Sequence, residues 1–505
     1  MTTIAPSGTP AARRIPFALA LLATGIPMFM ATLDNLVMTN ALPVLHEDLG
    51  ASVEELQWFI NGYTLVFASL ILFAVALGDR FGRRTVFAVG ITVFTVASAL
   101  AAFSTDPTQL IVARAIQGLG GAGIMPLSLS LLAGSVEPRR RPLAIGIWGG
   151  IAGLGVAAGP LIGGAVVQGW SWQGIFWINV PVGIIAVPLI LLILPNAFGD
   201  RVRADIVGVL LAGLGVLGIV FGIVRGNPAG WDSAEVIGSL TAGAVLLAAF
   251  IVWELRTTAP LLPLRLFRDR SFSVANVVGF GFSFGMFGSV FILIQFLQIV
   301  QGNSPLQAAV LTTPWTMAPM VVAPLAGAFA GRIGTRTLIV AGLTLQALGL
   351  FWIAMTMSAN VPYTTLLPAF IAAGIGMGLV FAPSSTAVLA HIRQEDTAKA
   401  SGTNSTLREI GVALGIAVLT AVFTGAGGQL TPTGYVDAAV PAVFVGASVL
   451  LATALIALLL PAGTLELKAG AISGRRGDAS DGDRLSRRVD ERDEELADAT
   501  ESVGV

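Results

Sequence analysis

Long apolar stretches alternate with short polar breaks along most of the chain. Three stretches, 142–199, 271–331 and 337–390, contain no Lys, Arg, Asp or Glu. Each is long enough for two membrane-spanning helices of about 20 residues. A scan for apolar segments of that length predicts fourteen spans, at 16–38, 55–77, 85–104, 108–134, 142–167, 174–195, 206–224, 236–253, 272–299, 306–330, 337–358, 362–390, 400–424 and 438–461. The pattern therefore predicts an all-α integral membrane protein.

Composition agrees with this prediction and excludes several classes of protein. Of the 505 residues, 55% are hydrophobic and 11% are charged, whereas a soluble globular protein carries about 25% charge. A net charge of −1 argues against nucleic acid as a partner. The chain has no cysteine and only two histidines, His46 and His391, which excludes disulfides and thiolate sites and argues against a histidine-based metal centre. No cofactor is expected.

Basic residues predict the orientation. With the N-terminus in the cytoplasm, all of the 28 Lys and Arg residues lie in inside segments except Arg114, Arg225 and Arg408. Positive charge accumulates on the cytoplasmic side of membrane proteins. We therefore expect both termini to be cytoplasmic, in a bacterial-type plasma membrane.

An internal repeat divides the chain. Residues 78–92 align with 330–344 at an offset of 252, and Gly50 and Ser52 align with Gly302 and Ser304 at the same offset. Parallel repeats of this kind are typical of transporters that rock about a midplane site. The predicted segments are a cytoplasmic N-terminus (1–15), a six-helix half (16–199), two inserted transmembrane helices (200–255), a cytoplasmic linker (256–271), a second six-helix half (272–461) and a disordered cytoplasmic tail (462–505).

The loop after the second span carries a gating candidate. It comprises Gly78, Asp79, Arg80, Gly82, Arg83 and Arg84. This string resembles the motif of the major facilitator superfamily, although Val75 departs from it, as does Gly331, which replaces the acid in the second copy. At a helix end among arginines, the Asp79 carboxylate can gain a basic partner in one conformation and lose it in another. The alternative is that these arginines only determine topology.

Two further strings narrow the resemblance. The fifth span contains a glycine motif similar to that of the export, or antiporter, branch: Gly155, Gly159, Pro160, Gly163 and Gly164. Small residues four apart permit close helix packing, which is also the alternative reading. The string from Leu33 to Pro43 resembles that of the fourteen-span drug:proton antiporter family, with Leu36 and Thr39 departing from it. Over residues 15–461, the resemblance implies the major facilitator fold.

Four ionisable residues lie inside predicted spans, where charge is costly and usually functional. They are Asp34, Arg114, Arg408 and Glu409. At about 1.5 Å per residue, Asp34 and Arg114 reach similar depths, so they are able to pair. Arg114 lies in a string that resembles the superfamily's fourth-span motif, whose arginine is associated with proton transfer. The four are predicted to couple transport to protons. The alternatives are a fixed ion pair for Asp34 and a structural role for Glu409.

Substrate-cavity candidates lie in two spans. Trp58 and Asn61 belong to the second span, and Phe284, Phe287 and Phe291 belong to a phenylalanine-rich ninth span. Aromatic side chains suit an apolar, adaptable pocket. The alternative is that most of these phenylalanines face lipid or neighbouring helices.

Together these features predict a proton-coupled antiporter and no enzyme. The chain has no phosphate-binding G-x-x-x-x-G-K-[ST] string, so the energy has to come from an ion gradient. The expected partners are protons, the lipid bilayer and a lipophilic small molecule such as a drug or antibiotic, which alternating access exports. The alternatives are a dedicated exporter of one metabolite or lipid, and a facilitator that takes up a nutrient. The sequence does not fix the oligomeric state, and a monomer is the default expectation.

Overall fold

The computed structural model describes residues 16–137, 140–198, 205–258, 260–392 and 396–461. The predicted N-terminal segment 1–15 and the tail 462–505 lie outside the described residues. Among the described residues, thirteen segments are long and apolar enough to cross a membrane. The glycine-rich helix α6, of 29 residues, is a further helix of comparable length.

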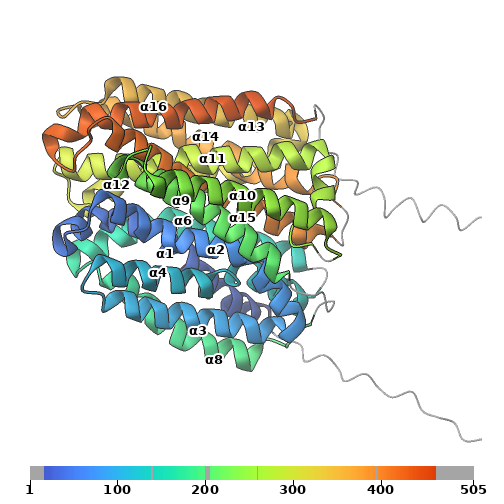
Figure 1. Ribbon diagram of the computed structural model, residues 1–505. Helices are drawn as coiled ribbons and strands as arrows, with labels where there is room; N and C mark the ends of the chain where they lie inside the picture. Colours follow the sequence, from blue (N-terminus) through green and yellow to red (C-terminus); the bar gives the residue numbers. More distant parts are fainter. Residues whose placement is uncertain (1–15, 138–139, 199–204, 259, 393–395, 462–505) are drawn as a thin grey trace, which may run out of the picture.

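Long helices running along one direction make up the bundle (Figure 1). The helices before residue 200 are α1 (Phe17–Leu49), α2 (Val53–Phe81), α3 (Arg83–Ala102), α4 (Pro107–Gly121), α5 (Ile124–Ser135), α6 (Arg141–Gly169), α7 (Gly174–Trp177) and α8 (Asn179–Ile193). Those after it are α9 (Ile206–Ala229), α10 (Ala234–Arg256), η2 (Leu264–Arg268), α11 (Arg270–Gln295), η3 (Phe296–Val300), α12 (Pro305–Ile333), α13 (Thr335–Thr356), α14 (Tyr363–Leu389), α15 (Thr397–Gly425) and α16 (Pro432–Ala457).

The internal repeat is visible in the backbone. Gly50 and Gly302, which are paired in the sequence, have φ angles of 63° and 66°. Ser52 and Ser304 follow them and cap α2 and α12 with the same reciprocal hydrogen bonds to the third helical residue. Such capping boxes satisfy amide groups at a helix start that have no partner within the helix. The two copies therefore begin their second spans in the same way.

Helix α9 connects the two repeats at the end of the bundle where α1 finishes and α2 begins. Arg225 of α9 forms ion pairs with Glu54 of α2 at 3.1 Å and with Glu235 of α10 at 2.9 Å. Asn227 Nδ2 donates hydrogen bonds to the Ala421 carbonyl and to Thr424 Oγ1 of α15, at 2.5 and 2.7 Å. Since α2 and α15 belong to different repeats, this end of α9 is bonded to both.

The seam between α6 and α12 is closed at one end by a hydrogen bond, and glycines toward its other end have open space beside them. At the closed end, Ser304 Oγ donates a hydrogen bond of 2.8 Å to Gln168 Oε1. At the opposite end, a Cβ atom built on Gly149 or Gly150 of α6, or on Gly331 of α12, would meet no described atom within 4 Å. These glycines lie at the end that the sequence predicts to be cytoplasmic.

Candidate functional site

Asp34 and Arg114 form a buried ion pair, as their predicted depths allow. Arg114 Nη1 lies 2.6 Å from Asp34 Oδ2, and the two side chains are 0% and 3% exposed. Two amides complete the carboxylate's surroundings, because Gln117 Nε2 and Asn179 Nδ2 each donate to Asp34 Oδ1 at 2.8 Å. Three helices, α1, α4 and α8, therefore meet at one carboxylate.

The arginine is held from the other side by α2. Its Nε donates a hydrogen bond of 2.9 Å to the Phe59 carbonyl, and Nη1 also donates to Gln117 Oε1 at 2.6 Å. The guanidinium carbon lies 4.5 Å from the centre of the Tyr63 ring, a cation–π distance. Arg114 Nη2 is buried and has no hydrogen-bond partner among the described residues. Both N–H groups of this nitrogen therefore lack an acceptor in the described part of the chain.

The sequence pointed to Asp34 and Arg114 but not to the amides around them. Gln117 lies one helical turn after Arg114, a spacing that places both side chains on one face. Asn179 is the first residue of α8 and shares Ser98 Oγ as an acceptor with Gln117, at 3.3 and 3.0 Å. The periodicity of Gln117 was available as a signal. Asn179 is far from Asp34 in the sequence, so no local pattern indicates that these two side chains meet.

Glu409 and Arg408 of α15 face different neighbours. The Arg408 guanidinium lies 4.5 Å from the centre of the Phe381 ring on α14. Glu409 Oε2 is buried and has no hydrogen-bond partner in the described part of the chain. These two adjacent side chains are not an ion pair in this conformation, and their predicted role in proton coupling stays a prediction.

The glycine motif of α6 fits against two different helices. A Cβ atom on Gly155 or Gly159 would lie 2.9 Å from the Cβ of Thr32 or Leu36 on α1. Beside these glycines, Asn40 Nδ2 of α1 donates a hydrogen bond of 3.2 Å to the Pro160 carbonyl of α6. The Cβ atoms of L residues do not approach this closely, so α1 and α6 require these glycines.

The end of the motif has other neighbours. A Cβ on Gly163 would lie 3.0 Å from the Cα of Val37 on α1. One on Gly164 would lie 2.6 Å from the Pro305 carbonyl oxygen of α12, in the other repeat. Gly164 is therefore a contact between the two halves, which motif spacing alone does not indicate.

The loop after α2 holds the gating candidates in one ion pair and several backbone contacts. Arg83 Nε lies 2.7 Å from Asp79 Oδ1, and Arg83 Nη1 donates to Ser130 Oγ of α5 at 2.5 Å. Arg84 Nη1 donates to the carbonyls of Leu191, in the last turn of α8, and Leu194, directly after α8, at 3.1 and 3.0 Å. The loop therefore joins α2, α5 and α8.

The remaining gating candidates have other surroundings. Gly82 has a φ of 99°, which an L side chain rarely adopts. Its counterpart in the repeat, Gly334, has a φ of 91°. Gly78 is buried against Leu127 of α5, and the Arg80 guanidinium lies 5.3 Å from the centre of the Phe81 ring. Both copies of the motif thus use the same turn.

An apolar cavity lies between the two halves. Its volume is about 10 Å³, and its lining comes from α1, α6, α11, α12 and α14: Leu36, Pro160, Met286, Val290, Leu293, Ile294, Thr312, Trp315, Thr316 and Met377. That volume holds about one water-sized group. A drug-sized substrate therefore requires the halves to move apart at this point.

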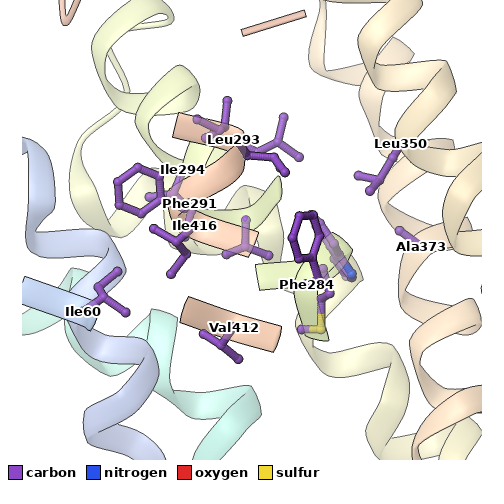
Figure 2. Packing of buried hydrophobic residues seen from close by; sticks show 14 of the residues in the cluster. Ile60, Phe284, Phe291, Leu293, Ile294, Leu350, Ala373, Val412 and Ile416 are labelled. Carbon is purple, nitrogen blue, oxygen red and sulfur yellow. The ribbon is translucent and has the colours of Figure 1, made fainter. Parts of the chain in front are cut away.

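The predicted cavity residues do not line this cavity. Phe284 and Phe291 are buried in the cluster between α11 and its neighbours, where Phe291 lies close to Ile416 of α15 (Figure 2). Trp58 packs toward α9, with its ring 6.2 Å from that of Phe221. Phe287 is partly buried and borders the same cluster as Phe284. Helix α11 lines the cavity through its aliphatic residues, and a substrate-binding role for Trp58, Asn61 and the phenylalanines stays a prediction.

Comparison with known proteins decides the family. The profile of the Major Facilitator Superfamily matches residues 24–302 and 275–480. The chain belongs to the major facilitator superfamily. It is a multi-pass membrane transporter and not an enzyme.

Three curated relatives of this transporter are named as resistance or export proteins. It is 34% identical to the tetracenomycin C resistance and export protein of Streptomyces glaucescens, over 84% of this chain and 79% of that protein. It is 33% identical to the methylenomycin A resistance protein of Bacillus subtilis, over 88% and 94%. It is 34% identical to the multidrug resistance protein Stp of Mycobacterium tuberculosis, over 80% and 75%.

Solved structures share the fold of the chain. An auto-inhibited POT family peptide transporter aligns with a TM-score of 0.64 and 16% identity, over 90% of this chain and 100% of that one. The peptide transporter POT in complex with sulfate aligns with a TM-score of 0.63 and 18% identity, over 87% and 95%. At this identity the likeness concerns the fold alone.

Proposed function

We propose that this transporter exports hydrophobic or amphipathic small molecules in exchange for protons. The observation that carries the proposal is the buried Asp34–Arg114 pair, whose carboxylate lies on α1, a helix that also lines the cavity. Burying charge inside a membrane protein is costly, and such residues usually serve ion or substrate pathways. The named activities of the relatives, resistance and export, support the outward direction.

Hydrogen-bond geometry suggests how a proton would change the structure. The two oxygens of Asp34 accept from three donors, on Arg114, Gln117 and Asn179. A protonated carboxyl has an O–H that donates, so one oxygen can no longer accept as before. Loading the proton also removes the negative charge that attracts Arg114, which favours separation of Asp34 from this donor. Since the donors lie on α4 and α8 and the acceptor lies on α1, protonation rearranges the packing of three helices.

The energy available is sufficient for export. One elementary charge moved across 100 mV supplies about 2.3 kcal/mol. At about 1.4 kcal/mol per tenfold ratio, this supports about a 50-fold concentration ratio of a neutral substrate. We place the transporter in a bacterial plasma membrane with both termini in the cytoplasm, because its basic residues gather at that end.

Inverted membrane vesicles test the proposal. In vesicles with an acidic interior, an exported lipophilic substrate is expected to enter as protons leave, so adding it should raise the internal pH. An ionophore that collapses the proton gradient should abolish both movements. Substrate uptake that persists without a proton gradient would instead support the facilitator alternative. Movement of one compound only, among several lipophilic ones, would support the dedicated exporter.

Asp79→Asn is expected to slow turnover about fivefold, far more than it weakens substrate binding, and to leave expression unchanged. Asp79 and Arg83 are 22% and 29% exposed, and a pair this exposed contributes up to about 1 kcal/mol. Losing about 1 kcal/mol from one conformation alone changes its population about fivefold. The matched control is Gly331→Ala at the repeat-related position, where a Cβ meets no described atom within 4 Å. Equal turnover in both variants would show that the Asp79 carboxylate does not contribute to gating.

A further inference from the structure

Three polar side chains of α2 are buried in a row, and each has at least one polar atom without a hydrogen-bond partner in the described part of the chain. Gln57, Asn61 and Thr64 are 3%, 0% and 0% exposed. Gln57 Oε1, both amide atoms of Asn61 and Thr64 Oγ1 have no hydrogen-bond partner among the described residues. Each buried polar group left unpaired costs about 1–3 kcal/mol, so such groups normally bond to protein or to ordered water.

The row faces α15. Thr406 Oγ1 of α15 donates to the Ala68 carbonyl of α2 at 3.3 Å, and a Cβ on Gly402 would contact the Leu72 side chain. Between these two contacts the residue number increases along α2 and decreases along α15, so the two helices are antiparallel. Residues 57, 61, 64 and 68 of α2 are separated by four, three and four positions, so their side chains lie on one face of the helix. This face therefore carries Gln57, Asn61 and Thr64 together with Ala68. Figure 2 shows the neighbouring Ile60 of α2 on the side of Val412 and Ile416 of α15.

Alanines lie opposite the row. Continuing the antiparallel register places Asn61 opposite Ala413 and Gln57 opposite Ala417, and both alanines are 0% exposed. They belong to the apolar cluster that includes Leu65 of α2. An alanine side chain can neither bond to an amide nor reach across to fill the space beside it. The face of α15 that meets the polar row therefore satisfies none of its hydrogen bonds.

We propose that the α2–α15 interface binds a file of water molecules that leads to the carboxyl group of Glu409. A buried water typically makes about three hydrogen bonds to polar groups that otherwise have no partner, which is what the three side chains offer. The register places Glu409 level with Leu65, next to Thr64, and its buried Oε2 has no partner among the described residues. The row therefore ends at an ionisable group.

The other end of the row approaches the surface. Gln57 lies about one helical turn after Glu54, whose carboxylate is partly exposed and pairs with Arg225 at 3.1 Å. The only charged side chain adjacent to Glu409 in sequence, Arg408, is stacked on Phe381 and directed to α14. The water file thus runs from the predicted outer surface to Glu409 along the side of α2 that faces α15.

Such a file would carry protons from outside to a Glu409 oxygen without using the apolar cavity between the halves. This part rests on the proposed function, because it matters only if the transporter consumes outside protons. It gives Asn61 a role that differs from its predicted place in the substrate cavity. A bound drug would then not block proton entry.

Radiolytic hydroxyl labelling of the purified protein tests for the water directly. An X-ray pulse turns bound water into hydroxyl radicals, which oxidise the nearest side chains, and mass spectrometry locates the products. We expect oxidation at Leu65 and Ile410 in the wild type and its loss in Asn61→Leu. Thr64→Val is a second variant that nearly keeps the side-chain shape, so its result does not depend on whether Asn61→Leu folds. It should also lose this oxidation. The control Ser69→Ala, on the α9 side of α2, should retain it.

Proton release in vesicles tests the role of the file. Asn61→Leu and Thr64→Val are expected to slow substrate-induced proton movement as Glu409→Gln does, with substrate binding unchanged. Absence of labelling at Leu65 and Ile410 in the wild type would overturn the water file, whatever the transport result. Lost labelling with normal proton movement would overturn the proton route. Labelled wild type without any proton movement would leave the water file standing and refute proton-coupled export.

Discussion

Asp34→Asn is expected to abolish gradient-driven export while leaving the folded protein in the membrane. The amide has nearly the shape of the carboxylate and one oxygen that can still accept from Gln117 and Asn179. It cannot bind and release a proton at neutral pH. Without the proton, the about 50-fold concentration ratio that one charge supports across 100 mV is lost.

Accumulation of a lipophilic dye measures this loss. Cells that express the wild-type protein should retain less dye than cells that lack the transporter. Cells that express Asp34→Asn should retain as much dye as cells that lack the transporter. Asp106→Asn is the matched control. The Asp106 carboxylate caps α4 by accepting a hydrogen bond of 3.0 Å from the backbone N–H of Gln109, and asparagine caps a helix equally well. Efflux at the wild-type rate in Asp34→Asn would refute the coupling role of this carboxylate.

Counterflow separates coupling from binding in the same variant. Exchange of labelled for unlabelled substrate across a vesicle membrane needs alternating access but no net energy. If Asp34 only couples the proton, exchange should continue in Asp34→Asn. If the Asp34–Arg114 pair also holds α1 against α4, exchange should stop as well.

The fold and part of the site follow from sequence because membrane spans leave strong periodic signals. Fourteen apolar segments and a 252-residue repeat indicate two six-helix halves with an insertion. Depth arithmetic brings Asp34 level with Arg114, since the rise per residue of a helix is fixed. Their amide partner Asn179 is 145 residues from Asp34. Nothing local in the sequence says which helices lie side by side.

The cavity was harder to predict for a related reason. Helix α11 is buried on nearly all sides, so no apolar stripe indicates which face meets the substrate path. Phenylalanine content suggested Phe284, Phe287 and Phe291, whereas the lining side chains include Met286 and Val290 on the intervening positions. Side-chain chemistry alone does not resolve the direction of a residue on a helix that has neighbours all round.

Gly164→Val is expected to prevent the closed end of the α6–α12 seam from forming and so to stop export. A Cβ at Gly164 would lie 2.6 Å from the Pro305 carbonyl oxygen and 2.8 Å from the Leu306 Cα. Both atoms are backbone and belong to the other half, so neither can turn away. Overpacking of this kind costs about 1–3 kcal/mol, which shifts a two-state equilibrium about 5- to 150-fold.

Cross-linking between two introduced cysteines measures the shift, and no native cysteine has to be removed first because the chain contains none. Gln168→Cys and Ser304→Cys replace side chains that bond to each other at 2.8 Å in the closed seam. A short thiol-reactive cross-linker should join them rapidly in the otherwise unchanged protein and slowly with Gly164→Val added. Gly150→Val is the control, since it makes the same change on the same helix where a Cβ meets no described atom within 4 Å.

Gly159→Val distinguishes a conformational effect from a folding defect. A Cβ at Gly159 would lie 2.9 Å from the Leu36 Cβ and 3.3 Å from the Leu33 carbonyl oxygen, both on α1 of the same half. That contact has to form in every conformation, so Gly159→Val should lower the yield of folded protein. The valine side chain of Gly164→Val contacts the other half only when the seam closes, so the yield of folded Gly164→Val protein should be normal. Equal losses of yield would mean that the contact between Gly164 and α12 persists throughout the transport cycle and that the halves do not separate there.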